Sequence, residues 1–412
     1  MFDFNESCFC DRCTGVGVMY RLDKHVLRVA AVCCAVSRFF HKFSGKKNIL
    51  IVANDGLGDL ILRLSHLREI RGHFPPEKYS ITLWLSPGFI PLASAAGVAD
   101  RFLKIPKWRN RLQWTVFRIS FWLTHSWDMI CDMTAFPPET RPWYGIFHPY
   151  KNAFFAATVY PISRPSRNNL KGEFKHIVDV SRMTAFERNS AVLSAMGISE
   201  PQRKVDFFRF CRPMPGMPPA GSYFVICSGA SDPVRCWEKE KFVELIDRLR
   251  DHLGLRVVLV GAGGELESCE EIRNKCGNPE EILDLAGKTS ILQLFTVIRD
   301  AAFLISNDTG SCHVGAALGV QTFIICGRGE FGAFVPYPEG VEGVTVHSIF
   351  SGGRTCGPCY WGDEECRKHK VYPCISDITA DEVFRRVISH VPKEKADFRN
   401  AVSDKRRAAQ EQ

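Results

Sequence analysis

Short apolar runs alternate with helical periodicity along most of this 412-residue chain. Residues 48–53 form a nearly continuous apolar run typical of a buried strand, and a helical pattern extends from Leu60 to about Arg71. The same order of strand and helix then repeats at 81–85, 91–96, 101–105, 108–125 and 127–132. Strands that alternate with helices predict a parallel, doubly wound sheet.

A second region of the same kind follows a Pro-rich stretch at 201–219, which we interpret as a linker. A helix is predicted at 176–196, and beyond the linker the predicted strands are 223–227, 256–260, 282–285, 301–305 and 322–326, with helices at 240–252, 291–300 and 312–318. The chain is therefore predicted to be α/β, with two Rossmann-like domains that face each other across a cleft. Their predicted bounds are 48–212 and 213–378, with an extension at 1–47 and a closing helix and charged, disordered tail at 379–412. Ligands of such sheets bind at the carboxyl ends of the strands.

Length and composition favour a soluble, two-domain protein. Apolar residues make up 45% of the chain and charged residues 24%, and no apolar run reaches the roughly 20 residues that span a bilayer. The longest run near the start, 29–36, is short and lacks a cleavage site, which argues against a signal peptide. Several of the 17 cysteines fall in apolar strands, as is typical of buried thiols in a reducing compartment. We therefore expect a cytoplasmic protein.

Positive charge is concentrated in two regions. Residues 20–47 hold seven Lys and Arg against one acid, and 101–127 hold six with no acid, interleaved with aromatic residues. A third region, 135–175, is Pro-rich, aromatic and basic. Such surfaces suit nucleic acid, an anionic membrane or a phosphorylated glycan, and a solvated helix face is the alternative.

One stretch, 304–319, combines the features of a binding site. An apolar strand leads into the turn at 307–310, and a helix of small residues begins near Cys312. Free backbone N–H groups and the positive end of a helix dipole meet there, which favours an anion. Small residues such as Gly315 let the helix lie close to the sheet. A tight strand–helix connection is the alternative, but Asp308 and His313 add polar groups that a turn does not need.

Other polar loops follow predicted strands in the same way. The turn at 54–59 ends in Asp59 at the start of a helix, where the dipole favours a carboxylate, although its G-x-G-D lacks the third glycine of a dinucleotide loop. In the second half, loops at 228–237, 261–265 and 287–289 follow strands. Arg235 in the first of them can present a bidentate fork to a phosphate.

Three motifs occur in a specific order: a Gly-Asp after the first strand, then G-A-S-x-x-x-R-x-W, then D-T-G-x-x-H. In these motifs the chain resembles glycosyltransferase family 9, the ADP-heptose:lipopolysaccharide heptosyltransferases. The likeness covers about 48–391 and implies the GT-B fold. Asp55 and Gly56 stand where the family typically has Ser or Thr, and Arg235 where Lys is common. Cys236 and Glu238 replace the basic residue and the Pro beside the tryptophan.

The resemblance implies an inverting, metal-independent transfer of heptose from ADP-heptose onto a lipopolysaccharide core or a related anionic glycan. Asp59 matches the general base that takes the acceptor's proton, with His66 and Asp55 as competitors. By likeness Asp308 binds sugar hydroxyls and Glu265 the ribose, and helix capping by Glu265 is an alternative. The implied donor site comprises Ser231, Arg235, Glu265, Gly287, Lys288, Thr289, Asp308, Thr309, Gly310, Ser311 and His313. No cofactor or bound metal is expected.

The implied partners are a nucleotide-sugar donor and an anionic glycolipid or glycan acceptor, with no nucleic acid. Regions 101–127 and 141–175 are the expected acceptor surface, and the basic leading helix suits peripheral contact with the inner membrane. Two other functions remain open on this fold: a non-hydrolysing nucleotide-sugar epimerase, and a non-catalytic glycan- or membrane-binding relative. The presence of Asp59 favours the transferase.

Two groups of cysteines have spacings that permit metal binding. The first group lies in the extension and consists of Cys8, Cys10 and Cys13. No second cluster of ligands follows it at the spacing of a zinc site. The second permits either a zinc site or free thiols and consists of Cys356, Cys359, Cys366 and Cys374.

Overall fold

The computed structural model describes residues 24–41, 45–104, 111–134, 154–159, 177–179, 183–199, 207–327, 346–349, 366–391, 398, 400 and 402–404. The chain folds into two compact units. The first comprises Met1–Asp55 and Arg63–Lys204, and the second comprises Gly56–Leu62 and Val205–Gln412. The N-terminal cysteines and most of the 135–175 region lie outside the described residues.

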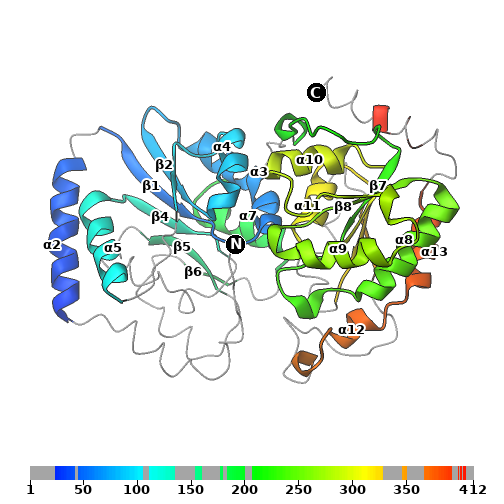
Figure 1. The fold of residues 1–412 in the computed structure, drawn as a ribbon. Coiled ribbons are helices and arrows are strands. Elements are labelled where there is room, and N and C mark those ends of the chain that lie inside the picture. The colour runs from blue at the N-terminus through cyan, green and yellow to red at the C-terminus, as the bar shows by residue number, and fades with distance from the viewer. Residues whose placement is uncertain are drawn as a thin grey trace. The chain divides into compact units, whose positions relative to one another are not determined.

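The first unit contains a six-stranded sheet in the order β3-β2-β1-β4-β5-β6, and every neighbouring pair is parallel (Figure 1). Its strands are β1 (Lys47–Val52), β2 (Tyr79–Trp84), β3 (Arg101–Leu103), β4 (Met129–Asp132), β5 (Phe154–Val159) and β6 (Ile177–Asp179). Its helices are α2 (Lys24–His41), α3 (Leu57–His73), α4 (Ile90–Ala96), α5 (Arg111–Thr124) and α7 (Ala185–Ala195), with the short 3₁₀ helix η3 (Pro87–Phe89). The start of α3, as far as Leu62, is grouped with the second unit. The chain order reverses between β1 and β4, which makes their carboxyl ends the switch point of this sheet.

The second unit repeats this architecture with the order β12-β11-β10-β7-β8-β9, again all parallel. Its strands are β7 (Tyr223–Cys227), β8 (Arg256–Leu259), β9 (Ile282–Asp284), β10 (Leu304–Asn307), β11 (Thr322–Ile325) and β12 (Val346–Ile349). Its helices are α8 (Lys239–Leu253), α9 (Leu266–Lys275), α10 (Ile291–Arg299), α11 (Gly310–Ala317), α12 (Pro373–Ser376) and α13 (Ala380–Ile388). Short 3₁₀ helices are η7 (Phe208–Phe210), η8 (Pro233–Arg235), η9 (Gly263–Glu265), η10 (Pro279–Glu281) and η11 (Cys366–Lys368). The switch point lies between β7 and β10, and the predicted pair of doubly wound sheets is confirmed.

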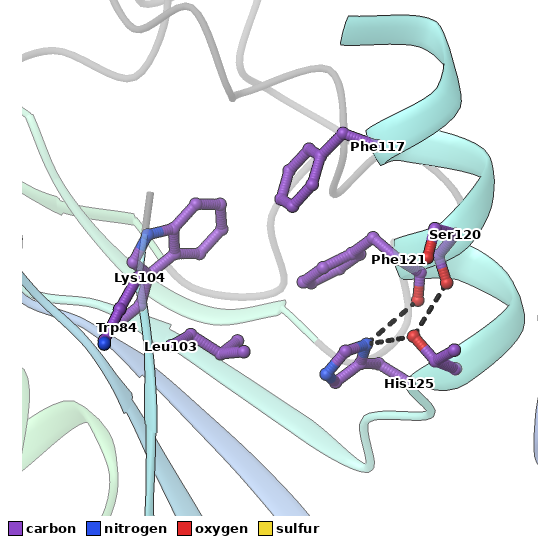
Figure 2. A pocket seen from close by; sticks show the side chains of 8 residues that line it. Trp84, Leu103, Lys104, Phe117, Ser120, Phe121 and His125 are labelled. Carbon is purple, nitrogen blue, oxygen red and sulfur yellow. Dashed lines mark hydrogen bonds between the residues drawn. The ribbon is translucent and has the colours of Figure 1, made fainter. Parts of the chain in front are cut away.

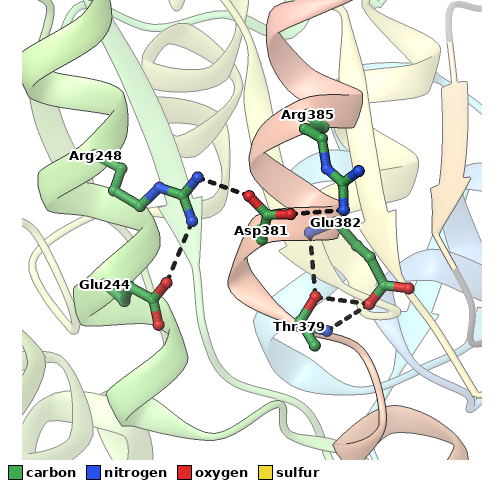
Figure 3. A network of polar contacts seen from close by, with 6 residues as sticks. All are labelled: Glu244, Arg248, Thr379, Asp381, Glu382 and Arg385. Carbon is green, nitrogen blue, oxygen red and sulfur yellow. Dashed lines mark hydrogen bonds and ion pairs between the residues drawn. The ribbon is translucent and has the colours of Figure 1, made fainter.

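The closing helix α13 packs against α8 through apolar side chains, with ion pairs at the surface. Val383 and Val387 are fully buried in the core of the second unit. Around them, Arg248 on α8 donates to Asp381 at 2.8 Å, and Thr379 caps α13 (Figure 3). Exposed ion pairs of this kind contribute at most about 1 kcal/mol. The buried apolar face therefore holds the helix in place.

Three parts of the sequence prediction are wrong. Residues 177–179 form strand β6 rather than the start of a helix, because this segment pairs with β5 and the helix begins only after Thr184, whose capping box with Glu187 fixes its first turn. Strand β5 lies in a region predicted to be loop. The tail at 392–412 is not wholly disordered, since Phe398 and Val402 are 2% and 3% exposed and Phe398 joins the core of the second unit.

The leading helix α2 packs against α5 (Figure 1). Its face toward the protein carries small side chains, including Ala30 and Cys34, which are fully buried. Within the described part of the chain, no helix is both long and apolar enough to cross a membrane.

Candidate functional site

Four loops meet at the carboxyl edge of the second sheet. They follow β7, β8, β9 and β10, which are neighbours in the order β10-β7-β8-β9. All eleven predicted donor residues lie on these loops or in the first turn of α11. The sheet topology alone therefore brings them to one edge, and specific contacts join each loop to the next.

The turn after β10 is the most deeply buried part of this edge. Asp308 and His313 are 7% and 3% exposed, and Thr309 precedes the first residue of α11. Burial raises the pKa of the Asp308 carboxyl, against the lowering effect of the Arg235 charge, and burial lowers the pKa of His313 to about 4. At neutral pH His313 is therefore uncharged.

The helix after this turn lies very close to the sheet, as the sequence predicts. A Cβ added at Gly315 would lie 2.5 Å from Thr322 Oγ1 and 2.8 Å from Leu304 Cδ2, distances that real Cβ atoms do not show. Only glycine fits here without movement of β10 or β11. The close approach fixes the start of α11 directly beyond the end of β10.

Asn307 joins the β10 turn to the loop after β7. This fully buried side chain accepts a hydrogen bond from Trp237 N–H at 3.2 Å and donates to the Ser228 carbonyl at 2.6 Å. Trp237 is also held by its indole N–H, which donates to the Ile378 carbonyl at 2.9 Å. Asn307 therefore fixes both ends of the loop that carries Arg235. The sequence analysis did not single it out, because its partners are backbone groups that no local motif reveals.

Ser231 and Arg235 lie within that loop. The guanidinium of Arg235 donates to the Ser231 hydroxyl, and Asp232 caps η8 by accepting from Val234 N–H at 3.2 Å. The Arg235 charge acts on the buried Asp308 carboxyl. A cation and a carboxylate from two adjacent loops thus face the same edge.

Glu265 joins the loops after β7 and β8. Its Oε2 accepts from Ala262 N–H at 2.6 Å, so the capping contact is present. Its Oε1 lies over Gly229, where an added Cβ would be 1.5 Å from that oxygen. Burial raises the pKa of Glu265, although the Ala262 N–H bond counteracts part of this. The loop after β7 therefore needs glycine at this position to admit the carboxylate, and ribose binding by Glu265 stays a prediction.

Gly287, Lys288 and Thr289 follow β9. Gly287 has a left-handed backbone conformation (φ 66°), and a Cβ there would lie 3.4 Å from the Cα of Gly263. Lys288 donates to the Asp284 carbonyl at 2.8 Å while remaining exposed. The loops after β8 and β9 are therefore adjacent.

One group of side chains at this edge has donor atoms of the kinds that bind metal. Ligand atoms of Asp308, Cys312 and His313 all lie within 4.8 Å of one another. However, the Cys312 thiol donates to the Thr309 carbonyl at 2.8 Å, and burial beside Asp308 raises its pKa well above the usual value. The thiol form is therefore favoured at neutral pH, whereas a metal needs the thiolate.

The thiols around the edge are buried. Burial raises the pKa of Cys227 to about 12 and that of Cys236 and Cys269 to about 11. Nine of the twelve cysteines that the structure describes are buried, as predicted from their apolar surroundings. Of the second cysteine group, Cys366 and Cys374 are described, while Cys356 and Cys359 lie outside the described residues.

A second polar cluster lies at the switch point of the first sheet. Arg63 on α3 donates to Asp55 Oδ2 at 2.7 Å, to the Met133 carbonyl at 2.7 Å and to Asn189 Oδ1 at 3.2 Å. The side chains of Arg63 and Asp55 are 3% and 1% exposed. These bonds join the ends of β1 and β4 to α7. Asp55 is thus a buried, ion-paired carboxylate rather than an accessible one.

The other two base candidates differ in their surroundings. His66 is fully buried, with Nε2 3.1 Å from Ser190 Oγ and its ring against the edge of Phe186. Asp59 is half-buried in the first turn of α3, as predicted for a carboxylate at a helix start. Of the three base candidates, Asp59 has the most accessible side chain.

A small pocket in the first unit lies between β2, β3 and α5 (Figure 2). Its volume is about 70 Å³, and its lining includes Trp84, Phe117, Phe121 and His125. Ligand pockets usually have volumes of about 300–1,000 Å³. This pocket is therefore too small for a nucleotide sugar.

The aromatic side chains of α5 do not form a binding platform. Trp114, Phe121 and Trp122 are 8%, 3% and 0% exposed, so they belong to the core. Arg118 lies over the Trp122 ring at 5.0 Å and is also buried. The expectation of an aromatic acceptor surface over 101–127 is therefore wrong for these residues, because the helix turns its aromatic face toward the sheet.

Two Rossmann-like sheets, the second with an anion-suited edge, are the architecture of GT-B glycosyltransferases. A solved structure with this fold, an Escherichia coli heptosyltransferase with ADP-2-deoxy-2-fluoro heptose, has a TM-score of 0.60 and 19% identity, covering 84% of this chain and 100% of that one. The chain therefore has the GT-B fold.

Sequence comparison finds relatives in one family of glycosyltransferases. The family profile of glycosyltransferase family 9 (heptosyltransferase) matches residues 170–349. Lipopolysaccharide heptosyltransferase 3 of Escherichia coli K12 is 27% identical over 180 residues, 42% of this chain and 52% of that protein. Lipopolysaccharide heptosyltransferase 1 of the same strain is 24% identical over 306 residues, 70% of this chain and 90% of that protein. The match to the first relative thus spans about half of its length. Residues 170–349 therefore match glycosyltransferase family 9, which supports the resemblance of the sequence motifs to that family.

Proposed function

We propose that the protein is an inverting glycosyltransferase that moves heptose from ADP-heptose onto a lipopolysaccharide core or a related anionic glycan. One observation carries this proposal: the contacts of Asn307, Arg235 and Glu265 join the loops after β10, β7 and β8 at one sheet edge. This edge lies at a topological switch point, where ligands of doubly wound sheets bind. The match of residues 170–349 to the heptosyltransferase family supports the same reaction class.

The donor diphosphate requires positive groups, because charge develops on the leaving phosphate during transfer. Arg235 supplies a guanidinium, and the N–H groups of Thr309, Gly310 and Ser311 lie at the start of α11. Asp308 and the neutral His313 then bind the sugar or phosphate by hydrogen bonds. In this proposal cations and N–H dipoles replace a metal ion.

Nucleotide binding involves the loops after β8 and β9. Glu265 accepts from a ribose hydroxyl through the oxygen that lies over Gly229, while its other oxygen keeps its bond to Ala262 N–H. Gly287 to Thr289 line the adenine. Ser231 orients Arg235 through the bond that its hydroxyl accepts.

The transfer needs one base to remove the proton of the acceptor hydroxyl. We assign this role to Asp59. Its competitor Asp55 is held by Arg63 in a buried ion pair, so that carboxylate is not accessible to an acceptor hydroxyl. His66 is enclosed between α3 and α7, with no exposed surface from which to reach an acceptor.

The acceptor in this proposal is an anionic glycolipid, which brings the enzyme to the cytoplasmic surface of the inner membrane. Exposed cations of the first unit, Arg101 and Lys104 among them, are consistent with an anionic acceptor. The aromatic residues of α5 have no part in it, because they are buried.

A donor screen tests the proposal. ADP-heptose at about 100 times its Kd should stabilise the folded protein by about 2.7 kcal/mol, which raises the Tm of a unit of this size by roughly 5–10 °C. UDP-, GDP- and dTDP-sugars should give smaller shifts. Arg235→Ala should reduce the shift, whereas Arg273→Ala should not, because this partly exposed arginine lies in the last turn of α9, about two turns beyond Glu265. A larger shift with another nucleotide would contradict the assignment of the donor.

A further inference from the structure

Large apolar side chains that are exposed to solvent are concentrated on two adjacent helices. Six such side chains occur in the described part of the chain, and five of them lie on α2 and α5. Val29, Val32 and Val36 on α2 are 46%, 64% and 42% exposed, and Val116 and Leu123 on α5 are 58% and 44% exposed. The sixth is Leu266 in the second unit. An isolated exposed apolar residue needs no explanation, but a contiguous set indicates an interaction site.

The spacing of these residues places them on outward faces. Positions 29, 32 and 36 follow the helical repeat and therefore share one face of α2, opposite the buried face with Ala30 and Cys34. On α5, Val116 and Leu123 are two turns apart. Because α2 packs against α5, the exposed sides of the two neighbouring helices are considered together, and we call them the α2–α5 face (Figure 1).

Both helices contain basic residues and no acid. The sequence of α2 has three Lys or Arg, and that of α5 has two, of which Arg118 is buried. Arg28 on α2 is exposed, as is Lys104, which lines the small pocket beside α5 (Figure 2). The exposed acids nearest in sequence to α5 have partners: Asp100 pairs with Arg71 at 2.6 Å, and Asp128 accepts from Asn48 N–H at 2.7 Å. The α2–α5 face therefore combines exposed apolar side chains with the exposed cations Arg28 and Lys104.

The geometry points to an anionic lipid bilayer as the partner of the α2–α5 face, with both helices lying in the plane of the surface. Apolar side chains would enter the boundary between headgroups and acyl chains, while Arg28, Lys104 and their neighbours would contact lipid phosphates. A second copy of this chain fits less well, because two such faces have no acid to pair with each other's cations. This inference rests on the proposed function in one respect, since a lipid-linked acceptor requires the enzyme at a bilayer.

Flotation of the full-length chain with vesicles tests the inference. The protein should bind vesicles of phosphatidylethanolamine and phosphatidylglycerol and release them as salt is raised, because surface charges are screened over about 8 Å at physiological ionic strength. Val32→Glu combined with Val116→Glu should lower vesicle binding at least tenfold. The matched control is Leu266→Glu. Among the residues that the structure describes, Leu266 is the one exposed large apolar side chain outside the face. This variant carries the same kind of charge and should bind vesicles like the parent protein. Circular dichroism of each variant verifies that it is folded.

Each other outcome overturns the inference. Equal binding by the double variant would show that the face does not touch lipid, and equal loss in the Leu266→Glu control would show an effect of charge alone. A parent that is dimeric in sedimentation and becomes monomeric in the double variant would assign the face to a second copy. Calorimetry with ADP separates the two proposals: absent vesicle binding with intact ADP binding contradicts only this inference, whereas absent ADP binding contradicts the transferase.

Discussion

Replacing Asn307 by alanine removes the three side-chain hydrogen bonds that hold the loop after β7, the weakest of them to the Gly229 carbonyl at 3.5 Å. The change leaves Trp237 N–H and the Ser228 carbonyl without their partner in a region where Asn307 is fully buried. An unsatisfied buried polar group costs about 1–3 kcal/mol, and water entering the space left by the amide would recover part of this. We expect a loss of roughly 2–4 kcal/mol in the free energy of unfolding. This corresponds to a decrease in Tm of about 5–15 °C for a unit of this size.

Thermal unfolding and calorimetry with ADP measure the two consequences. Asn307→Ala should lower Tm and also weaken ADP binding at least tenfold, because the loop that it releases carries Arg235. Ser306→Ala is the control: this neighbouring buried hydroxyl donates to the Asn307 carbonyl within the same strand, so its loss should leave ADP binding unchanged. A Tm within about one degree of the parent, or equal ADP affinity in a destabilised variant, would refute the positioning role of Asn307.

Three further predictions concern charge and metal. Arg235→Ala should weaken ADP binding by about ten- to a hundredfold, from the loss of a charged hydrogen bond of roughly 1.5–3 kcal/mol, and unchanged affinity in calorimetry would exclude this role. The pKa of His313 is about 4 in the folded state against the usual 6.5, so the unfolded state binds more protons between these values. Stability should therefore fall as pH is lowered from about 6.5 to 4, and His313→Asn should flatten this dependence in urea titrations with EDTA present. Transfer activity should survive dialysis against EDTA, and a loss that a divalent metal restores would contradict a metal-independent reaction.

The sequence predicts the framework of the fold well, because buried parallel strands leave a clear apolar signal. Residues 223–227 coincide with β7, all of it buried, and the closeness of α11 to the sheet follows from Gly315. Strand β6 is missed because a three-residue strand has no periodicity to detect, and its identity depends on pairing with β5. The burial of Phe398 depends likewise on a distant contact, with Phe303.

The candidate site is predictable only in part. Arg235, Glu265 and Asp308 each lie in a loop that follows a strand. Because the carboxyl ends of parallel strands lie at the same edge of a sheet, the sequence places these three residues at one edge. The role of Asn307 is not predictable, because its partners are backbone groups 70 and 79 positions away in the sequence. The direction of the α5 aromatics is not predictable either, since aromatic residues among basic ones suit both a binding surface and a core, and only packing on Trp84 distinguishes the two.

Turnover of Asp59→Asn tests the central claim most directly. ADP release from ADP-heptose should be measured with a lipopolysaccharide-core acceptor, beside ADP affinity and Tm on the same preparation. Asparagine retains the shape of the side chain and much of its capping ability, so folding should survive. If Asp59 is the general base, turnover should fall by about 10²–10⁴-fold with ADP affinity nearly intact. Near-parental turnover in Asp59→Asn, or no acceptor-dependent ADP release by the parent protein, would contradict the account.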